Sequence, residues 1–222
     1  AGTNIADFDI SVAYGENQNT LLKSDVISET IVQLIAKEAN KPDSIIKIPS
    51  DLYLGDLNTA NRNGWYNVYT GNELTQKGEI SYLLEALELI TNGGSFTDIK
   101  FDLSVAYGEN QNKLLKSLVI SETLVHQITN EANIGGLLEL PSTKYLEDID
   151  AKARDNWFNE YLDDELVKKG EIAYLLDAVE LITAGSDFKG IQFDINVAFG
   201  SNQDILLHST IISETIVSMI ND

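Results

Sequence analysis

Cysteine is absent from this sequence of 222 residues, and proline, histidine and methionine are scarce. Without cysteine the chain can form no disulfide, offers no thiolate to a metal ion and has no thiol nucleophile. A disulfide-stapled secreted domain of eukaryotic type is therefore excluded. No cofactor is predicted, because no phosphate-binding glycine loop and no metal-ligand motif is present.

Basic residues are also few, with 15 Lys and Arg against 35 Asp and Glu, which gives a net charge of -20. A chain this acidic repels phosphate backbones, so we expect no nucleic-acid partner. It also repels an anionic membrane surface. No apolar run reaches the roughly 18 residues that a membrane span needs, so no membrane insertion is expected.

One motif occurs three times, at residues 21–32, 114–125 and 206–217. Its shared core is Leu-Leu-x-Ser-x-(Val/Ile)-Ile-Ser-Glu-Thr-(Ile/Leu)-Val. Residues 8–35 and 101–128 are identical at 22 of 28 positions, and 101–128 and 193–220 at 16 of 28. This spacing predicts a tandem repeat of about 92 residues.

The first half of each repeat opens with alternating apolar residues. The pattern covers residues 8–14, 99–107 and 191–199, and its period of two predicts a half-buried strand. A glycine follows each run and predicts a turn. In the second copy, some of the apolar residues could instead share one face of a helix.

A serine stands just before each copy of an amphipathic pattern, at Ser24, Ser117 and Ser209. These positions predict N-caps of helices over residues 25–38, 118–131 and 210–221. The Ser-Glu-Thr tripeptide lies inside each helix. Because no histidine or lysine recurs beside its serine as a base, we expect a structural role, on a solvated face or between repeats.

The second half of the repeat begins with short apolar runs at 45–48 and 137–140, each stopped by a proline and predicted to be a strand. Gly64 and Asn156 are equivalent and predict a tight turn with positive φ. The aromatic segments that follow, 65–69 and 157–161, predict short extended pieces.

The clearest helices are predicted over residues 77–91 and 169–183, where leucine and isoleucine fall on one stripe. Gly93, Gly94 and Gly185 predict their C-caps. A single apolar stripe must pack against other elements, because a helix of this length is not stable alone in water. We therefore expect these helices to pack onto first-half elements.

The predicted fold class is α+β, with two amphipathic helices and short strands in each repeat. One division gives repeats at 1–98 and 99–190, with 191–222 as the first half of a third repeat. Equally compatible units are 36–128 and 129–222. The sequence alone leaves this phase open.

Two groups of residues are candidates for binding. Trp65, Tyr69, Trp157 and Tyr161 form equivalent aromatic clusters that could stack on a sugar or lie in the core. Asp163, Asp164 and Glu165 form an acidic cluster that could hold calcium, although their spacing is not that of an EF-hand loop. The cluster has no counterpart in the other repeat, where Gly71 and Asn72 stand instead.

No catalytic residue is predicted. His126 and His208 do not recur at equivalent positions, so we expect each to be an isolated surface residue. An enzyme would need an acid–base pair repeated with the motif, and none is found.

These observations favour a non-enzymatic structural or interaction segment of an extracellular or cell-surface bacterial protein, such as an adhesin or stalk. Its partners would be other repeats of the same array and a protein or glycan ligand. The alternative is a carbohydrate- or peptide-binding module that uses the Trp65 and Trp157 surfaces.

Overall fold

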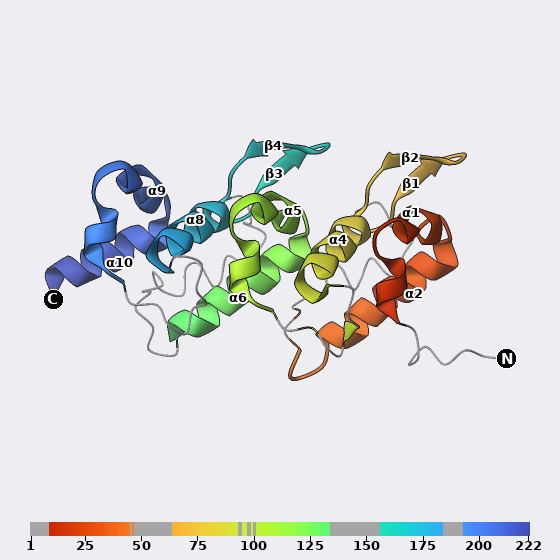
Figure 1. Ribbon diagram of the computed structural model, residues 1–222, viewed down its shortest axis with the longest axis horizontal. Helices are drawn as coiled ribbons and strands as arrows, with labels where there is room; N and C mark the ends of the chain where they lie inside the picture. Colours follow the sequence, from red (N-terminus) through yellow and green to blue (C-terminus); the bar gives the residue numbers. More distant parts are fainter. Residues whose placement is uncertain are drawn as a thin grey trace. The chain divides into compact units, whose positions relative to one another are not determined.

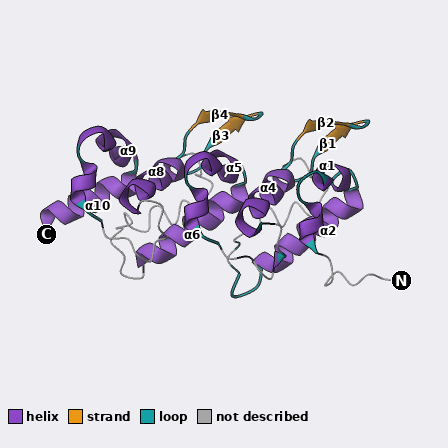
Figure 2. Cartoon of the chain, viewed as in Figure 1, coloured by secondary structure: helices purple, strands orange, loops and turns teal. Residues whose placement is uncertain are grey.

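The computed structural model describes residues 9–44, 46, 64–92, 95, 96, 99, 101–133, 156–183 and 193–222. The chain divides into two compact units. The first comprises Ala1–Phe101 and Lys116–Thr123, and the second Asp102–Leu115 and Leu124–Asp222. Helices and two-stranded antiparallel sheets occur together, which confirms the α+β class (Figures 1 and 2).

The first unit contains short helices, a β-hairpin and longer helices, in this chain order: η2 (Ile10–Ala13), α1 (Asn17–Leu21), α2 (Asp25–Ala39), β1 (Val68–Thr70), β2 (Glu73–Gln76) and α4 (Glu79–Thr91). Helix α6 (Leu118–Asn133) begins in this unit. The second unit contains η4 (Leu103–Ala106), η5 (Gly108–Asn110), α5 (Gln111–Leu115), β3 (Glu160–Leu162), β4 (Glu165–Lys168), α8 (Glu171–Thr183), η7 (Ile195–Ala198), η8 (Gly200–Asn202), α9 (Gln203–His208) and α10 (Thr210–Asn221).

The alternating runs form 3-10 helices instead of the predicted strands. Each begins after an aspartate whose carboxylate accepts the N–H two residues on, as Asp9 does from Ser11 at 3.0 Å. This local bond offers the backbone an alternative to a sheet. The buried residues are Ile10 and Ala13, three apart, and Val12 between them is exposed. The spacing of three matches the 3-10 period, so the apparent alternation was misleading.

The predicted N-caps are confirmed. Ser24, Ser117 and Ser209 each accept the backbone N–H three residues on, at 3.2–3.3 Å. The helices that follow, α2, α6 and α10, begin at the next residue and agree with the predicted ranges to within two residues. These helices therefore start where the sequence places a side-chain acceptor for their first turn.

The two hairpins have the same register. Tyr69 pairs with Leu74 in the first, and Tyr161 pairs with Leu166 in the second. Each has a two-residue loop whose first residue has positive φ, namely Gly71 at 61° and Asp163 at 52°. The predicted extended segments are thus the first strands of hairpins, although they begin at Val68 and Glu160 rather than at the tryptophans.

Helices α4 and α8 confirm the predicted ranges to within two residues, and their apolar stripes are buried. The loop before each helix supplies carbonyl acceptors to its first N–H groups. Gly64 O accepts from Glu79 N at 2.9 Å, and Asn156 O accepts from Glu171 N at 2.8 Å. Gly64 and Asn156 do lie in turns, as predicted, but Gly64 does not have the positive φ that was expected. The turns are held by these bonds to the helix instead.

Some predictions lie outside the described residues. They are the strand at 45–48 apart from Ile46, the strand at 137–140 and the C-caps at Gly93, Gly94 and Gly185. At the described end of α4, the residue in the left-handed conformation is Asn92, with φ of 50°. Asparagine tolerates this region well, so it takes the role expected of glycine.

Candidate interaction interface

The tryptophans of the predicted ligand site are buried. Trp65 is 2% exposed and Trp157 is 3% exposed, so neither indole presents a face to solvent. Tyr69 and Tyr161 are half-buried on the hairpins. The predicted sugar-stacking platform is therefore reduced to the two tyrosines, whose hydroxyls already contact the protein.

The acidic cluster lies in the β3–β4 hairpin. Asp163 and Asp164 form its two-residue loop, Glu165 begins β4, and all three are exposed. Among the residues that the structure describes, no three acidic or histidine side chains are grouped as ligands of a metal ion. Calcium binding at this loop stays a prediction.

A buried carboxylate joins α4 to the start of α6. Glu79, the first residue of α4, accepts the hydroxyl hydrogen of Ser117 at 2.7 Å and the N–H of Val119 at 3.0 Å. Ser117 in turn accepts the N–H of Ile120. One glutamate thus lies at the N-termini of two helices, where the helix dipoles favour a negative charge. We call this contact the carboxylate joint.

The same joint occurs in the second unit. Glu171, the first residue of α8, accepts from the Ser209 hydroxyl at 3.0 Å and from Ile211 N at 3.3 Å. Ser209 caps α10 by accepting from Ile212 N. Glu79 and Glu171 are 92 residues apart, as are Ser117 and Ser209. Both joints therefore connect equivalent positions.

Burial perturbs these carboxyl groups. It raises the pKa of Glu79 to about 7, against the hydrogen bonds from Val119, Ser117 and Leu118, which lower it. Burial also raises the pKa of Glu171, which is less enclosed. Each group therefore holds a proton to higher pH than an exposed glutamate does.

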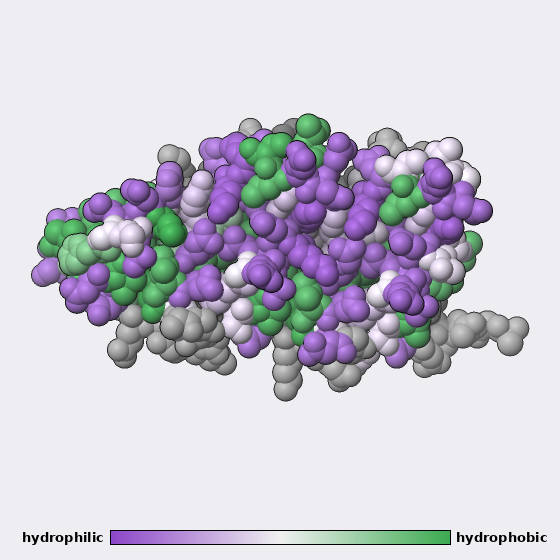
Figure 3. Space-filling model, turned by 45° about the horizontal axis from the view of Figure 1, so that its top comes forward, coloured by the Kyte–Doolittle hydropathy of each residue, from purple (hydrophilic) through white to green (hydrophobic). Residues whose placement is uncertain are grey.

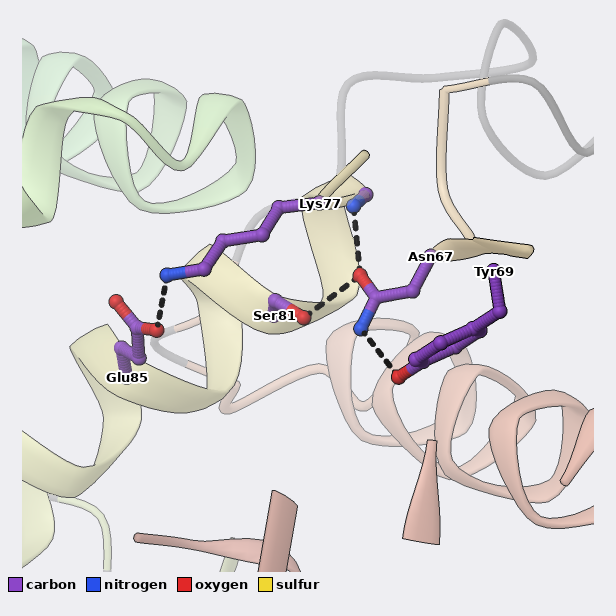
Figure 4. A network of polar contacts seen from close by, with 6 residues as sticks. Asn67, Tyr69, Lys77, Ser81 and Glu85 are labelled. Atoms are coloured by element: carbon purple, nitrogen blue, oxygen red, sulfur yellow. Dashed lines mark hydrogen bonds and ion pairs between the residues drawn. The ribbon is translucent and has the colours of Figure 1, made fainter. Parts of the chain in front are cut away.

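A second recurrent contact centres on an asparagine that ties the hairpin to the following helix (Figure 4). Asn67 Oδ1 accepts from Gly78 N and from the Ser81 hydroxyl, both at 2.7 Å. Its Nδ2 group donates to the Tyr69 hydroxyl at 3.2 Å. Figure 4 also shows the ion pair between Lys77, which precedes α4, and Glu85 in α4.

In the second unit, Asn159 makes two of these contacts. Its Oδ1 atom accepts from Gly170 N at 2.7 Å, and its Nδ2 group donates to the Tyr161 hydroxyl at 3.1 Å. The contact with Ser81 has no counterpart, because Ala173 stands at the equivalent position. We call the shared set the asparagine joint.

The tyrosine hydroxyls extend this joint to the preceding short helix. Tyr69 donates to the backbone oxygen of Asn19 in α1 at 3.4 Å, and Tyr161 donates to that of Asn112 in α5 at 3.3 Å. In the second unit, Gln111 also donates to Asp177 of α8 at 3.0 Å. Each hairpin–helix segment, 64–91 or 156–183, therefore binds the short helix that precedes it and caps the long helix that follows it.

His208 is exposed, as predicted from the sequence, but it is not isolated. Its ring stacks on Tyr174 of α8, with centroids 4.8 Å apart. At the equivalent place in the first unit, the ammonium group of Lys116 lies 5.6 Å from the centre of the Tyr82 ring. A cationic or aromatic side chain that lies on a tyrosine ring of α4 or α8 thus adds a third contact to the carboxylate and asparagine joints.

The exposure of the Ser-Glu-Thr tripeptide differs between its copies, since Glu214 in α10 is exposed whereas the copy in α6 is buried. The Ser28 hydroxyl donates to Leu22 O at 3.0 Å, and Thr30 donates to Val26 O at 2.7 Å. In α6 all three members of the tripeptide are buried. These hydroxyls bond backbone carbonyls near helix ends and within helices.

Hydrophobic periodicity misses Glu79, Glu171, Asn67 and Asn159. A different signal marks them, because Lys-Gly-Glu-Ile occurs at 77–80 and again at 169–172, and both asparagines recur at the same spacing. Polar residues that persist between diverged copies are candidates for joints.

No protein-family model, curated protein or solved structure matches this chain. Within the described ranges, no helix combines the length and apolar character needed to cross a membrane. Function therefore has to be inferred from the residues themselves.

Proposed function

We propose that the chain is a non-enzymatic structural or interaction segment built from a tandem repeat of about 92 residues. It belongs to an extracellular or cell-surface bacterial protein of the adhesin or stalk kind. Repeats of this sort provide length and multiple binding positions without new chemistry.

The observation that carries the proposal is the recurrence of the joints. Glu79 with Ser117 and Glu171 with Ser209 are equivalent pairs, and so are Asn67 with Gly78 and Asn159 with Gly170. The carboxylate joint connects a hairpin–helix segment to the long helix that follows it, and the asparagine joint holds the hairpin to the helix within the segment. Polar groups that the copies share are therefore used for assembly, as an array requires.

The negative net charge argues against nucleic-acid binding. A net charge of -20 opposes association with phosphate backbones and keeps a long array soluble. The partners that we propose are further repeats of the same array and a protein or glycan ligand. The burial of both indoles gives the glycan-binding alternative less support than the structural role.

Single-molecule stretching of the full chain tests the repeat. We expect successive unfolding events, each releasing a similar length, because each repeat unfolds as a unit. An increment of 92 residues corresponds to roughly 330 Å of extended chain, at about 3.6 Å per residue. A single event that releases the whole chain, or extension without resistance, would count against the proposal.

Exchange of equivalent segments tests it independently. Replacing residues 64–91 by a copy of 156–183 keeps the joints with α1 and α6, because both segments carry the glutamate, the asparagine and the tyrosine. We expect a thermal unfolding curve close to that of the parent chain. The matched control is the same exchange with the copy of Glu171 changed to Ala, which should be less stable. Loss of folding in the plain exchange would show that the segments are not equivalent.

Tryptophan emission addresses the glycan alternative. Because both indoles are buried, we expect blue-shifted emission that added oligosaccharides leave unchanged. A saturable spectral change with an oligosaccharide, abolished by Tyr69→Ala or Tyr161→Ala, would favour the binding module instead.

A further inference from the structure

The helices α9 and α10 carry an exposed apolar face. Figure 3 shows hydrophobic surface over these helices, toward the C-terminal end of the chain. We define the docking face by four residues and their exposed fractions: Phe199 (62%), Leu207 (50%), Val217 (58%) and Ile220 (68%). Exposed apolar residues that gather on one part of the surface mark an interaction site more often than singly scattered ones do.

The equivalent residues elsewhere in the chain are buried. In the first unit they are Tyr14, Leu22, Val32 and Ile35, and in the second they are Tyr107, Leu115, Val125 and Ile128. None of these eight is more than 7% exposed. Because the apolar character is kept at all three places, the exposed face has the same packing chemistry as the two that are covered.

The structure also shows what lies against the covered copies. In the first unit, Tyr69 of the hairpin bonds Asn19 O, and Glu88 of α4 lies against Gly15. In the second unit, Tyr161 bonds Asn112 O, and Asp177 of α8 bonds the buried Gln111. In both units, a hairpin followed by a helix therefore contacts the short helix that lies in the same copy as the covered apolar residues.

Beside the docking face, the polar residues are equivalent to those that a hairpin–helix segment contacts in the second unit. Gln203 is equivalent to Gln111 and to the buried Gln18, yet it is exposed. The backbone of Asp204 stands where Asn112 accepts the tyrosine hydroxyl. The face therefore offers a carbonyl acceptor and an amide donor, as well as apolar area, to a hairpin–helix segment.

We propose that the docking face binds a hairpin–helix segment of a further repeat, with the chemistry of residues 131–190. Its tyrosine hydroxyl donates to Asp204 O, and its helix covers Leu207, Val217 and Ile220. A second copy of this chain does not fit, because both described hairpin–helix segments are already bound to their own short helices. This inference rests on the repeat proposed above.

Cysteine labelling tests the proposal, since the chain has no cysteine of its own. Leu207→Cys is introduced into the full chain and into an extended chain in which a copy of residues 131–190 follows Asp222. We expect maleimide to label position 207 at least ~10-fold more slowly in the extended chain, because the added segment covers it. Val26→Cys, which is exposed on α2, should react equally in both chains.

A matched control changes the copies of Leu175 and Leu176 in the added segment to Asp. These leucines are buried in α8, so the altered copy should not protect position 207. The segment 131–190 is also supplied as a separate peptide, which tests docking should the extended chain fold poorly. Protection by the unaltered segment in either format, absent with the altered one, supports the proposal.

Unchanged labelling in both formats would overturn it. So would protection of the unextended chain that increases with its own concentration, because the face would then bind a second copy. The segment-exchange and stretching experiments do not depend on what binds the docking face. Failure of this inference is therefore distinguishable from failure of the proposed function.

Discussion

Glu79 illustrates how a single residue combines opposing electrostatic effects. Its carboxylate accepts two hydrogen bonds at helix N-termini, which favour the charged form. Its burial disfavours that form more strongly, so the pKa rises to about 7. A group with this pKa is partly protonated in neutral solution, and it links the stability of the first unit to pH.

Glu79→Gln should remove that link. Because the folded pKa lies above the unfolded value, the folded state binds more protons between about pH 4.5 and 7. The stabilisation from this group is complete below the unfolded pKa and is lost as the pH rises through the folded pKa. As the pH rises across this window, the free energy of unfolding of the parent chain should therefore fall by up to ~3 kcal/mol relative to that of Glu79→Gln.

Urea unfolding at pH 5 and pH 8, followed by Trp65 emission in a Trp157→Phe background, measures this difference. Glu171→Gln is the matched control, and its effect should be smaller because Glu171 is less enclosed. Parallel pH profiles for the parent chain and Glu79→Gln would show that Glu79 titrates normally.

Asp163 affects stability through its backbone conformation. It has φ of 52° in the hairpin loop, whereas glycine fills the equivalent place at Gly71. Because a side chain is unfavourable in this conformation, Asp163→Gly should stabilise the second unit by ~0.5–1 kcal/mol. The thermal midpoint measures the change. Gly71→Asp should lower stability by a similar amount, and a midpoint that falls with Asp163→Gly would contradict the argument.

At the scale of elements, close backbone approach holds each hairpin to its helix. A Cβ atom added to Gly78 would lie 2.4 Å from Trp65 O, and one added to Gly170 would lie 2.4 Å from Trp157 O. Only glycine allows the loop carbonyls to reach the first N–H groups of α4 and α8. The glycines are therefore required by packing, although φ at Gly78 is an ordinary -91°.

Gly78→Ala should consequently destabilise the first unit. The added methyl group forces the loop away from α4 and weakens the bond of Ile80 N to Trp65 O, at a cost of ~2–3 kcal/mol. Gly64→Ala is the control, because nothing lies within 4 Å of a Cβ atom there. Chemical denaturation compares the two variants. Equal stability of both would mean that the loop moves aside without cost.

At the scale of the whole molecule, charge dominates. Thirty-five acidic residues against fifteen basic ones give repulsion in any compact state. Dissolved ions screen such repulsion over roughly 8–10 Å at moderate ionic strength. Partly exposed ion pairs, such as Lys77 with Glu85 and Lys168 with Glu160, offset little of it.

Added NaCl near neutral pH should therefore raise the free energy of unfolding, on the order of 1 kcal/mol. Thermal unfolding over a salt series measures the increase. CaCl2 at equal ionic strength should act alike if screening is the cause. A larger gain with calcium, lost in Asp163→Asn with Asp164→Asn, would instead establish cation binding at the β3–β4 loop.

The sequence by itself determined the long helices, their N-caps and the recurrence of the chain pattern. These features depend on local chemistry, since a serine before an apolar stripe caps and orients a helix in any context. It also predicted the burial of Trp65 as one of two options. Local pattern was misleading at residues 8–14, where an aspartate bonds the backbone two residues on and a 3-10 helix forms.

Tertiary structure alone decided which polar residues join the elements. Glu79 and Ser117 lie 38 residues apart, and Tyr69 and Asn19 lie 50 apart, so no local pattern shows that they meet. The burial that raises the pKa of Glu79 likewise exists only after α4 and α6 have packed. Phe199 is 62% exposed, whereas the equivalent Tyr14 and Tyr107 are buried, and the sequence of the three copies does not show this difference.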